Sequence, residues 1–162
     1  MGDKKGVDSK SFMDQTTITS VEFGEECSFV GVEAFARCTS LSGINTDNVV
    51  ETIDESAFAG CKSLNEVEFL EVTSIGANAF TGCENLNYIG IPNCKEIKDG
   101  AFKECQNLEC VEKQKQPEKE AYIYNSAFQN CSKLYKIYFE NYENQILNAI
   151  ETLVNNAVSK GK

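Results

Sequence analysis

The chain of 162 residues contains no histidine and no tryptophan, and it has only two prolines. Without histidine it cannot form a Ser-His or Cys-His nucleophile pair, an imidazole metal ligand or an imidazole pH switch. No stretch approaches the roughly 20 apolar residues of a membrane-spanning helix, so we expect no membrane insertion. The first six residues are polar, and no apolar run of the secretory type follows them.

Positive charge is also scarce, because 25 acidic residues stand against 15 basic ones and the net charge is -10 at pH 7. Nucleic acids and anionic membranes bind clustered Lys and Arg side chains, so the sequence argues against both as partners. With 41% apolar residues the chain can still bury a core. The acidity favours a protein partner with a basic or mixed-charge surface.

Cysteine is the residue type in excess, with eight copies. A disulfide framework would be expected in a secreted chain of under about 100 residues, and neither condition holds for this sequence. The sequence therefore favours a reduced, intracellular (cytoplasmic) protein. The alternative is a surface or secreted protein whose signal sequence has been removed.

A motif that reads Ala-Phe-x-x-Cys-x-x-Leu-x-x-Ile/Val occurs five times. Its Phe residues are 23, 22, 22 and 26 positions apart: Phe35, Phe58, Phe80, Phe102 and Phe128. A degenerate copy at Phe12 carries Gln15 in place of the Cys. A period of 22–23 residues is typical of a solenoid, because one coil cannot bury its own apolar face. We expect about six coils.

This pattern resembles the BspA-like subfamily of leucine-rich repeats, whose unit reads approximately L-x-x-I-x-x-x-A-F-x-x-C-x-x-L-x-x-I-x-(L/I/F)-P. The segment from Leu86 to Pro92 matches even the terminal proline. The resemblance covers about residues 12–139. It implies an α/β leucine-rich-repeat solenoid, right-handed, with a short parallel β-sheet on the concave face and 3₁₀ or irregular segments on the convex side. The family is known from bacterial surface proteins and is expanded in several protozoa.

We divide the chain into a flexible N-terminus (1–11), the solenoid (12–140) and a C-terminal helix (141–162). Asn141 or Asn144 can cap this helix, and apolar residues follow at helical spacing. The helix over 144–158 either covers the open end of the last coil, as solenoids require, or contacts a partner. The charged run 112–120 lengthens the last interval and predicts a surface loop.

The Leu-x-x-Ile-x-Phe segment of each coil is the predicted strand. Residues nine and eleven positions after the repeated Phe should point inward, and those eight and ten positions after it should point to the open face. Thr46 and Lys113 interrupt the inward column. The open face is acidic in its middle and carries Tyr and Lys at its C-terminal end, and Tyr is a common interface anchor. We expect the protein-binding residues to be Glu22, Asn45, Glu66, Glu68, Tyr88, Glu109, Glu112, Tyr135, Lys136 and Tyr138. The alternative is a face that is only solvated.

The five repeated cysteines are predicted to be small, buried core residues. A zinc site would need two close Cys pairs or a Cys/His mixture, so we expect no metal and no cofactor. Cys27 and Cys94 occupy a column that elsewhere holds Val, which makes them core residues as well. Cys110 alone should point outward, where Glu109 and Glu112 disfavour its thiolate.

These observations favour a non-catalytic protein-binding module or scaffold, as a subunit of a larger intracellular assembly. The family resemblance implies an alternative, a cell-surface or secreted adhesion protein. A third possibility is a carboxylate-based hydrolase that uses Asp and Glu pairs of the open face. The sequence predicts no pocket that would exclude water from such a pair, and we expect no enzyme.

Overall fold

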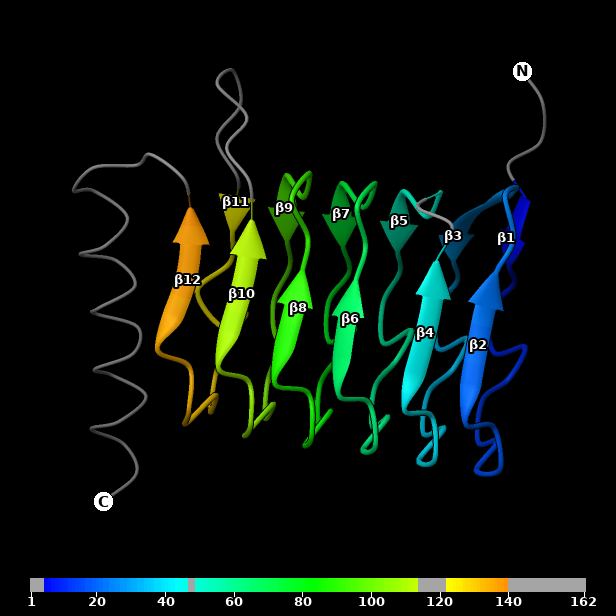
Figure 1. The fold of residues 1–162 in the computed structure, drawn as a ribbon, viewed down its shortest axis with the longest axis horizontal. Coiled ribbons are helices and arrows are strands. Elements are labelled where there is room, and N and C mark those ends of the chain that lie inside the picture. Colours follow the sequence, from blue (N-terminus) through cyan, green and yellow to red (C-terminus); the bar gives the residue numbers. More distant parts are fainter. Residues whose placement is uncertain (1–4, 47–48, 114–121, 140–162) are drawn as a thin grey trace.

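The computed structural model describes residues 5–46, 49–113 and 122–139, apart from the side chains of Tyr138 and Phe139. Each coil contributes one strand to the face that points toward the reader in Figure 1 and one strand to the opposite face. All the strand pairs are parallel. The described part of the chain is therefore a parallel β-solenoid.

The predicted strands form the face toward the reader, which we call the front face. It contains a pair, β2 (Ser20–Phe23) and β4 (Gly43–Thr46), and a four-stranded sheet of β6 (Glu66–Glu68), β8 (Tyr88–Gly90), β10 (Cys110–Lys113) and β12 (Lys136–Phe139). Most of the inward residues are buried as expected, among them Val67, Phe69, Ile89 and Ile91. Val21, Ile44 and Ile137 are half-buried and pack against the core. Between the two parts, the Thr46 hydroxyl donates a hydrogen bond to the Glu68 carbonyl at 3.2 Å.

The two residues that interrupt the inward column are buried as well. Thr46 is 9% and Lys113 is 5% exposed. Thr46 stands where most coils have an apolar residue. Its hydroxyl donates a hydrogen bond to the neighbouring coil, so no buried donor is left without a partner. Burial lowers the pKa of Lys113.

The opposite face is a second sheet, which we call the rear sheet. It comprises β1 (Lys5–Val7), β3 (Cys27–Val30), β5 (Thr52–Ile53), β7 (Ser74–Ile75), β9 (Glu96–Ile97) and β11 (Tyr122–Ile123). The expectation of 3₁₀ or irregular structure on this side was wrong. A β-branched residue recurs five positions before each repeated Phe, and its neighbours pair across coils, for example Thr52 with Ser74. A strand needs only such pairing to form, even over two residues.

The first coil begins earlier than expected. We predicted a flexible segment over residues 1–11, whereas Lys5–Val7 form β1 and pair with β3. The backbone N–H groups of Lys10, Phe12 and Asp14 then donate to carbonyls of the next coil at 2.8–2.9 Å. Residues 5–11 are thus part of the solenoid. The loop expected over 112–120 lies largely, and the helix expected over 141–162 entirely, outside the described residues.

The repeated Phe side chains form a continuous stack inside the solenoid. Successive rings from Phe12 to Phe128 lie 5.1–5.3 Å apart, centroid to centroid, and are within 12° of parallel. The backbone supports the same spacing, because each Phe N–H from Phe12 to Phe102 donates to the carbonyl of the Ala that precedes the next Phe, at 2.7–2.8 Å. The recurring Ala-Phe pair of the motif is therefore explained by contacts between coils.

The repeated cysteines are buried and free, as expected. Each thiol also has a partner, because it donates to the carbonyl of the Phe in the preceding coil at 3.0–3.2 Å, from Cys38 with Phe12 to Cys131 with Phe102. Burial raises the pKa of the Cys61 thiol to about 12 and that of Cys94 to about 11. The Cys61 and Cys94 thiols therefore stay protonated at neutral pH and can act as donors. Cys27 is only half-buried.

Candidate functional site

Six of the ten expected binding residues lie in two rows across the four-stranded sheet of the front face. One row runs through Glu66, Tyr88, Cys110 and Lys136, which are direct neighbours in register. The other row runs through Glu68, Gly90, Glu112 and Tyr138. The structure describes the backbone of Tyr138 in β12 and not its side chain.

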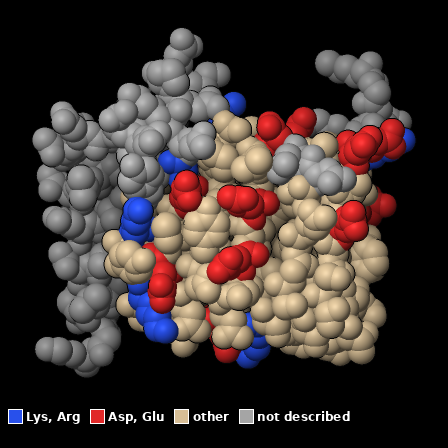
Figure 2. All heavy atoms as spheres, viewed as in Figure 1, with Lys and Arg blue, Asp and Glu red and all other residues tan. Residues whose placement is uncertain are grey.

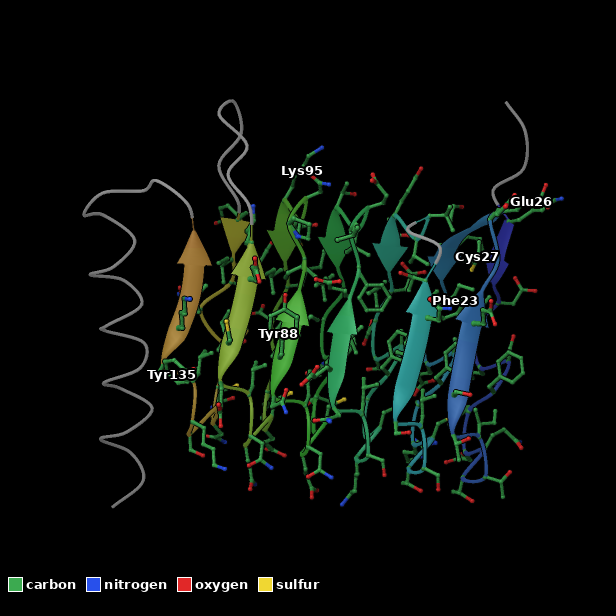
Figure 3. All side chains as sticks on the ribbon, in the orientation of Figure 1. Phe23, Glu26, Cys27, Tyr88, Lys95 and Tyr135 are labelled. Atoms are coloured by element: carbon green, nitrogen blue, oxygen red, sulfur yellow. The ribbon has the colours of Figure 1, made fainter. Side chains whose placement is uncertain are left out.

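Tyr88 connects the two rows. Its hydroxyl donates to Oε2 of Glu112 at 2.8 Å and lies 3.4 Å from Oε1 of Glu68. The tyrosine is half-buried, and Figure 3 shows its ring near the middle of β8 on the front face. We expected Tyr88 to offer a free anchor to a partner. Instead the two carboxylates hold its polar end, so a partner would meet a fixed Glu-Tyr-Glu group.

Gly90 provides the space that this arrangement needs. It is in register with Glu68 on one side and Glu112 on the other. A β-carbon at this position would lie 2.6 Å from Cγ of Glu68 and 3.0 Å from the Tyr88 hydroxyl oxygen. The missing side chain lets the tyrosine reach across the strand to both carboxylates. We call Glu68, Tyr88, Gly90 and Glu112 the carboxylate clamp.

The carboxylate clamp alters the acidity of the phenol. Burial raises the pKa of Tyr88, and the neighbouring Glu112 and Glu68 carboxylates raise it further. A folded-state pKa above the unfolded value of about 10 means that the unfolded chain loses this proton first. The contribution to stability is therefore complete below about pH 10 and falls as pH rises further.

We expect one tyrosine of the native protein to ionise clearly later than a free tyrosine would. An absorbance titration of the phenolate band should show this late step in the native chain and lose it in Tyr88→Phe. After unfolding, both chains should titrate near pH 10. A native Tyr88→Phe protein that retains the late step would contradict the assignment.

Cys110 is the one thiol that the structure places on the front face, and it lies beside the carboxylate clamp in the described part of the sheet. Partial burial raises its pKa, Glu112 raises it further, and Lys136 opposes the shift. The thiol is therefore the stable form at neutral pH, as the sequence predicted. The nearby Lys136 does not outweigh burial and Glu112, so Cys110 is not activated as a nucleophile.

The remaining expected residues lie outside the carboxylate clamp. Glu22 and Asn45 are exposed neighbours on the separate pair β2 and β4. Glu109 precedes β10 and is exposed, while Tyr135 precedes β12 and is 75% exposed. The structure thus gathers Glu66, Glu68, Tyr88, Glu112 and Lys136 on one sheet and leaves the others at its margins.

Sequence reasoning missed two features of this region. The first is the role of Gly90 in making room for the Tyr88 side chain. Its signal in the sequence was a Gly two residues after an outward Tyr, at the repeat position that holds Glu68 and Glu112 in the neighbouring coils. The second is a shallow groove along the starts of the front strands, lined by Ser42, Ser63, Asn65, Asn85, Asn87, Asn107, Glu109 and Lys133. The repeated polar residues five and seven positions after each Phe were its signal.

The charge distribution on the front face broadly matches the predicted one, acidic in the middle and basic toward the C-terminal end. Figure 2 shows acidic side chains over the middle of the front face and basic side chains toward its C-terminal side. Glu66, Glu68 and Glu112 make no ion pair with another described residue. Their charge is therefore open to solvent or to a partner. No helix in the part of the chain that the structure describes has the length and apolarity to cross a bilayer.

Several solved structures share this fold. They include a leucine-rich-repeat protein of T. pallidum, with 24% identity and a TM-score of 0.70 over 83% of this chain and 64% of that one. The pneumococcal vaccine antigen PcpA has 19% identity and a TM-score of 0.69 over 96% and 38%. A leucine rich cell surface protein from Faecalibacterium prausnitzii has 23% identity and a TM-score of 0.59 over 83% and 42%. The chain spans less than two thirds of the length of each of these proteins.

No curated protein matches the sequence significantly. The model of the BspA type leucine rich repeat region matches it in six copies, over residues 5–135 and, overlapping with these, 70–152. This match covers most of the chain and includes the coils whose Phe stack and thiol bonds have been described. The chain belongs to the BspA-type leucine-rich-repeat family.

Proposed function

We propose that the chain is a non-catalytic protein-binding module and that its front face is the binding surface. The observation that carries this proposal is the carboxylate clamp. Glu68 and Glu112 make no ion pair with another described residue, and the Tyr88 hydroxyl restricts both side chains by donating to Glu112 at 2.8 Å and lying 3.4 Å from Glu68. A binding group that is already ordered loses less conformational entropy when a partner arrives.

The charge of the front face points to the class of partner. Glu66, Glu68 and Glu112 provide negative charge in the middle of the sheet, and Lys136 adds a positive group at its C-terminal side. Opposite charge across an interface speeds association and selects partners. A protein surface that is basic, with some acidic residues, is the complement. The predicted contact through a helix over 144–158 stays a separate prediction, because it lies outside the described residues.

The hydrolase alternative receives less support. Glu68 and Glu112 lie two strands apart on an open sheet, and both contact the same hydroxyl. A general acid needs a surrounding that raises its pKa and keeps bulk water away. Proteins built from leucine-rich repeats are generally binding modules rather than catalysts, and we place this chain among them.

Two settings are compatible with a binding module. All eight cysteines are free, and this favours an intracellular assembly, because the cytosol keeps thiols reduced. The comparisons give that location no support. The F. prausnitzii protein is named a cell surface protein, and this name favours the cell-surface location of the alternative. Free thiols that are buried as core residues are compatible with both an intracellular and a cell-surface location.

The test removes the two charges of the carboxylate clamp and keeps its shape. In Glu68→Gln/Glu112→Gln the amide oxygens can still accept the Tyr88 hydroxyl. We expect proteins captured from the native source by the unchanged chain to bind this variant at least about tenfold more weakly, since desolvated charge pairs contribute a few kcal/mol. Binding should also weaken as salt rises. Affinities should be measured with the purified captured partner by calorimetry.

The matched control is Glu55→Gln, which removes the charge of an exposed residue that follows β5 of the rear sheet. It should bind like the unchanged chain. Equal melting temperatures would show that all three proteins are folded. If every captured protein binds the double variant as tightly as the control, the front face is not the binding surface.

A further inference from the structure

The groove along the starts of the front strands is a second surface with its own chemistry. Its volume is about 670 Å³, and it is open to solvent. The lining residues come from five successive coils and occupy only two positions of the repeat, five and seven residues after the Phe. The solenoid thus repeats the same polar site from coil to coil, at the spacing of adjacent strands, about 4.8 Å.

Four carboxamides dominate the groove: Asn65, Asn85, Asn87 and Asn107. Nδ2 of Asn87 donates to Oδ1 of Asn65 at 2.8 Å, and Nδ2 of Asn107 donates to the Glu84 carbonyl at 2.8 Å. These bonds fix the direction of the amides and leave much of their capacity unused. The amide of Asn85 has no hydrogen-bond partner among the described residues. Each amide offers both donors and acceptors, so a ligand rich in groups of both kinds is the complement.

The charges of the groove favour a neutral ligand. Glu109 and Lys133 are the only charged residues among the described ones that line it, and they have opposite sign. The remaining lining residues are Ser and Asn, and the lining is mostly polar. A basic protein patch would be drawn instead to the glutamates of the carboxylate clamp, none of which lines the groove. The ligand that fits this groove therefore forms hydrogen bonds with the Asn amides and Ser hydroxyls and carries no net charge.

The spacing of the groove distinguishes two neutral polymers. An extended peptide advances about 3.3 Å per residue, so its amides would fall out of step with coils about 4.8 Å apart. A pyranose unit in a 1,4-linked chain is close in length to one coil. Each unit also presents several hydroxyls that donate and accept. An oligosaccharide lying along the solenoid axis would meet the same pair of positions at every coil.

An exposed aromatic ring stands at the C-terminal end of the groove. Tyr135 is 75% exposed, and its N–H donates to the carbonyl of Glu109, a lining residue, at 3.3 Å. Figure 3 shows it at the start of β12, on the same edge of the front face. The apolar face of a sugar ring can stack on such a ring, while the phenol hydroxyl remains available for a hydrogen bond.

We propose that this groove binds a neutral oligosaccharide with one sugar unit per coil. The Asn amides hydrogen-bond to the sugar hydroxyls, and the terminal sugar ring stacks on Tyr135. The site is separate from the carboxylate clamp. It does not depend on the protein partner proposed above.

The test uses calorimetric titration of the full chain with cellohexaose, chitohexaose and mannohexaose. At least one of them should bind with a Kd of about 1 mM or below. Asn85→Ala and Tyr135→Ala should each weaken this binding about three- to tenfold, because each removes one hydrogen-bonding or stacking contact. Both residues are exposed, so both variants should fold. Binding should change little with salt, because the ligand is neutral.

Two controls keep the test specific. Asn45→Ala removes an exposed amide of the front face that does not line the groove, and it should bind the sugar unchanged. Glu68→Gln/Glu112→Gln should also bind it unchanged, whatever it does to a protein partner. The proposal is overturned if none of the three sugars binds at about 1 mM. It is equally overturned if Asn85→Ala binds as tightly as the unchanged chain, or if a hexaglycine peptide binds and the sugars do not.

Discussion

Phe80→Ala should destabilise the chain by about 3–5 kcal/mol, a large part of the roughly 5–15 kcal/mol by which an ordinary domain is stable. The Phe80 ring is fully buried. It stacks at 5.3 Å on Phe58 and on Phe102 and contacts Phe69 at 6.2 Å. In a solenoid each coil is stabilised by its neighbours, so a cavity at the centre weakens two interfaces at once. Urea unfolding followed by circular dichroism would measure the loss.

The matched control is Phe12→Ala at the end of the same stack. Phe12 is 41% exposed and stacks on one ring only among the described residues, Phe35 at 5.1 Å. Its removal leaves no closed cavity and should cost about 1–2 kcal/mol. Equal losses for the two variants would show that the stack does not couple the coils as described.

Gly76→Ala should also be strongly destabilising, by about 2 kcal/mol or more, although it adds a single methyl group. A β-carbon at Gly76 would lie 2.6 Å from the Asp54 carbonyl carbon and from the Glu55 nitrogen. Both are backbone atoms of the preceding coil, which cannot turn away as a flexible side chain could. The coils would have to separate at this point and lose part of the rear sheet between β5 and β7. A drop in melting temperature of several degrees is the expected result.

Gly43→Ala provides the comparison, because nothing in the described part of the chain lies within 4 Å of the β-carbon that it would add. Alanine should be neutral there or stabilise slightly, by reducing the freedom of the unfolded chain. If Gly76→Ala melts at the temperature of Gly43→Ala, the close approach of the two coils is not a constraint on the fold.

The sequence was sufficient for the strands of the front face and for the core. Ala, Phe, Cys and Leu recur at fixed offsets, and a side chain that recurs once per coil must stack on its counterpart. The inward positions of Val67 and Ile89 followed from strand alternation alone. Two-residue strands such as β5 were not predictable in this way. Their pairing depends on the neighbouring coil, and a pattern of two residues is too short to indicate a strand.

The candidate site was predictable as a set of residues but not as an arrangement. Alternation placed Glu68, Tyr88 and Glu112 on the same face. It could not show that the Tyr88 hydroxyl binds both carboxylates, because that depends on the rotamer of Tyr88 and on the space above Gly90. The groove was missed for a related reason. Its lining residues precede the strands, and only the stacking of successive coils makes them neighbours.

The sequence by itself determined that the chain is a repeat protein, which side chains form its core and which residues face outward on the front strands. These properties depend on period and polarity, and both can be read along one dimension. The tertiary structure decided that the opposite side is a sheet, that residues 5–11 belong to the first coil and that Tyr88 is held between two glutamates. Each of these features is a contact between coils about 22 residues apart in the chain, which a sequence pattern can permit but cannot specify.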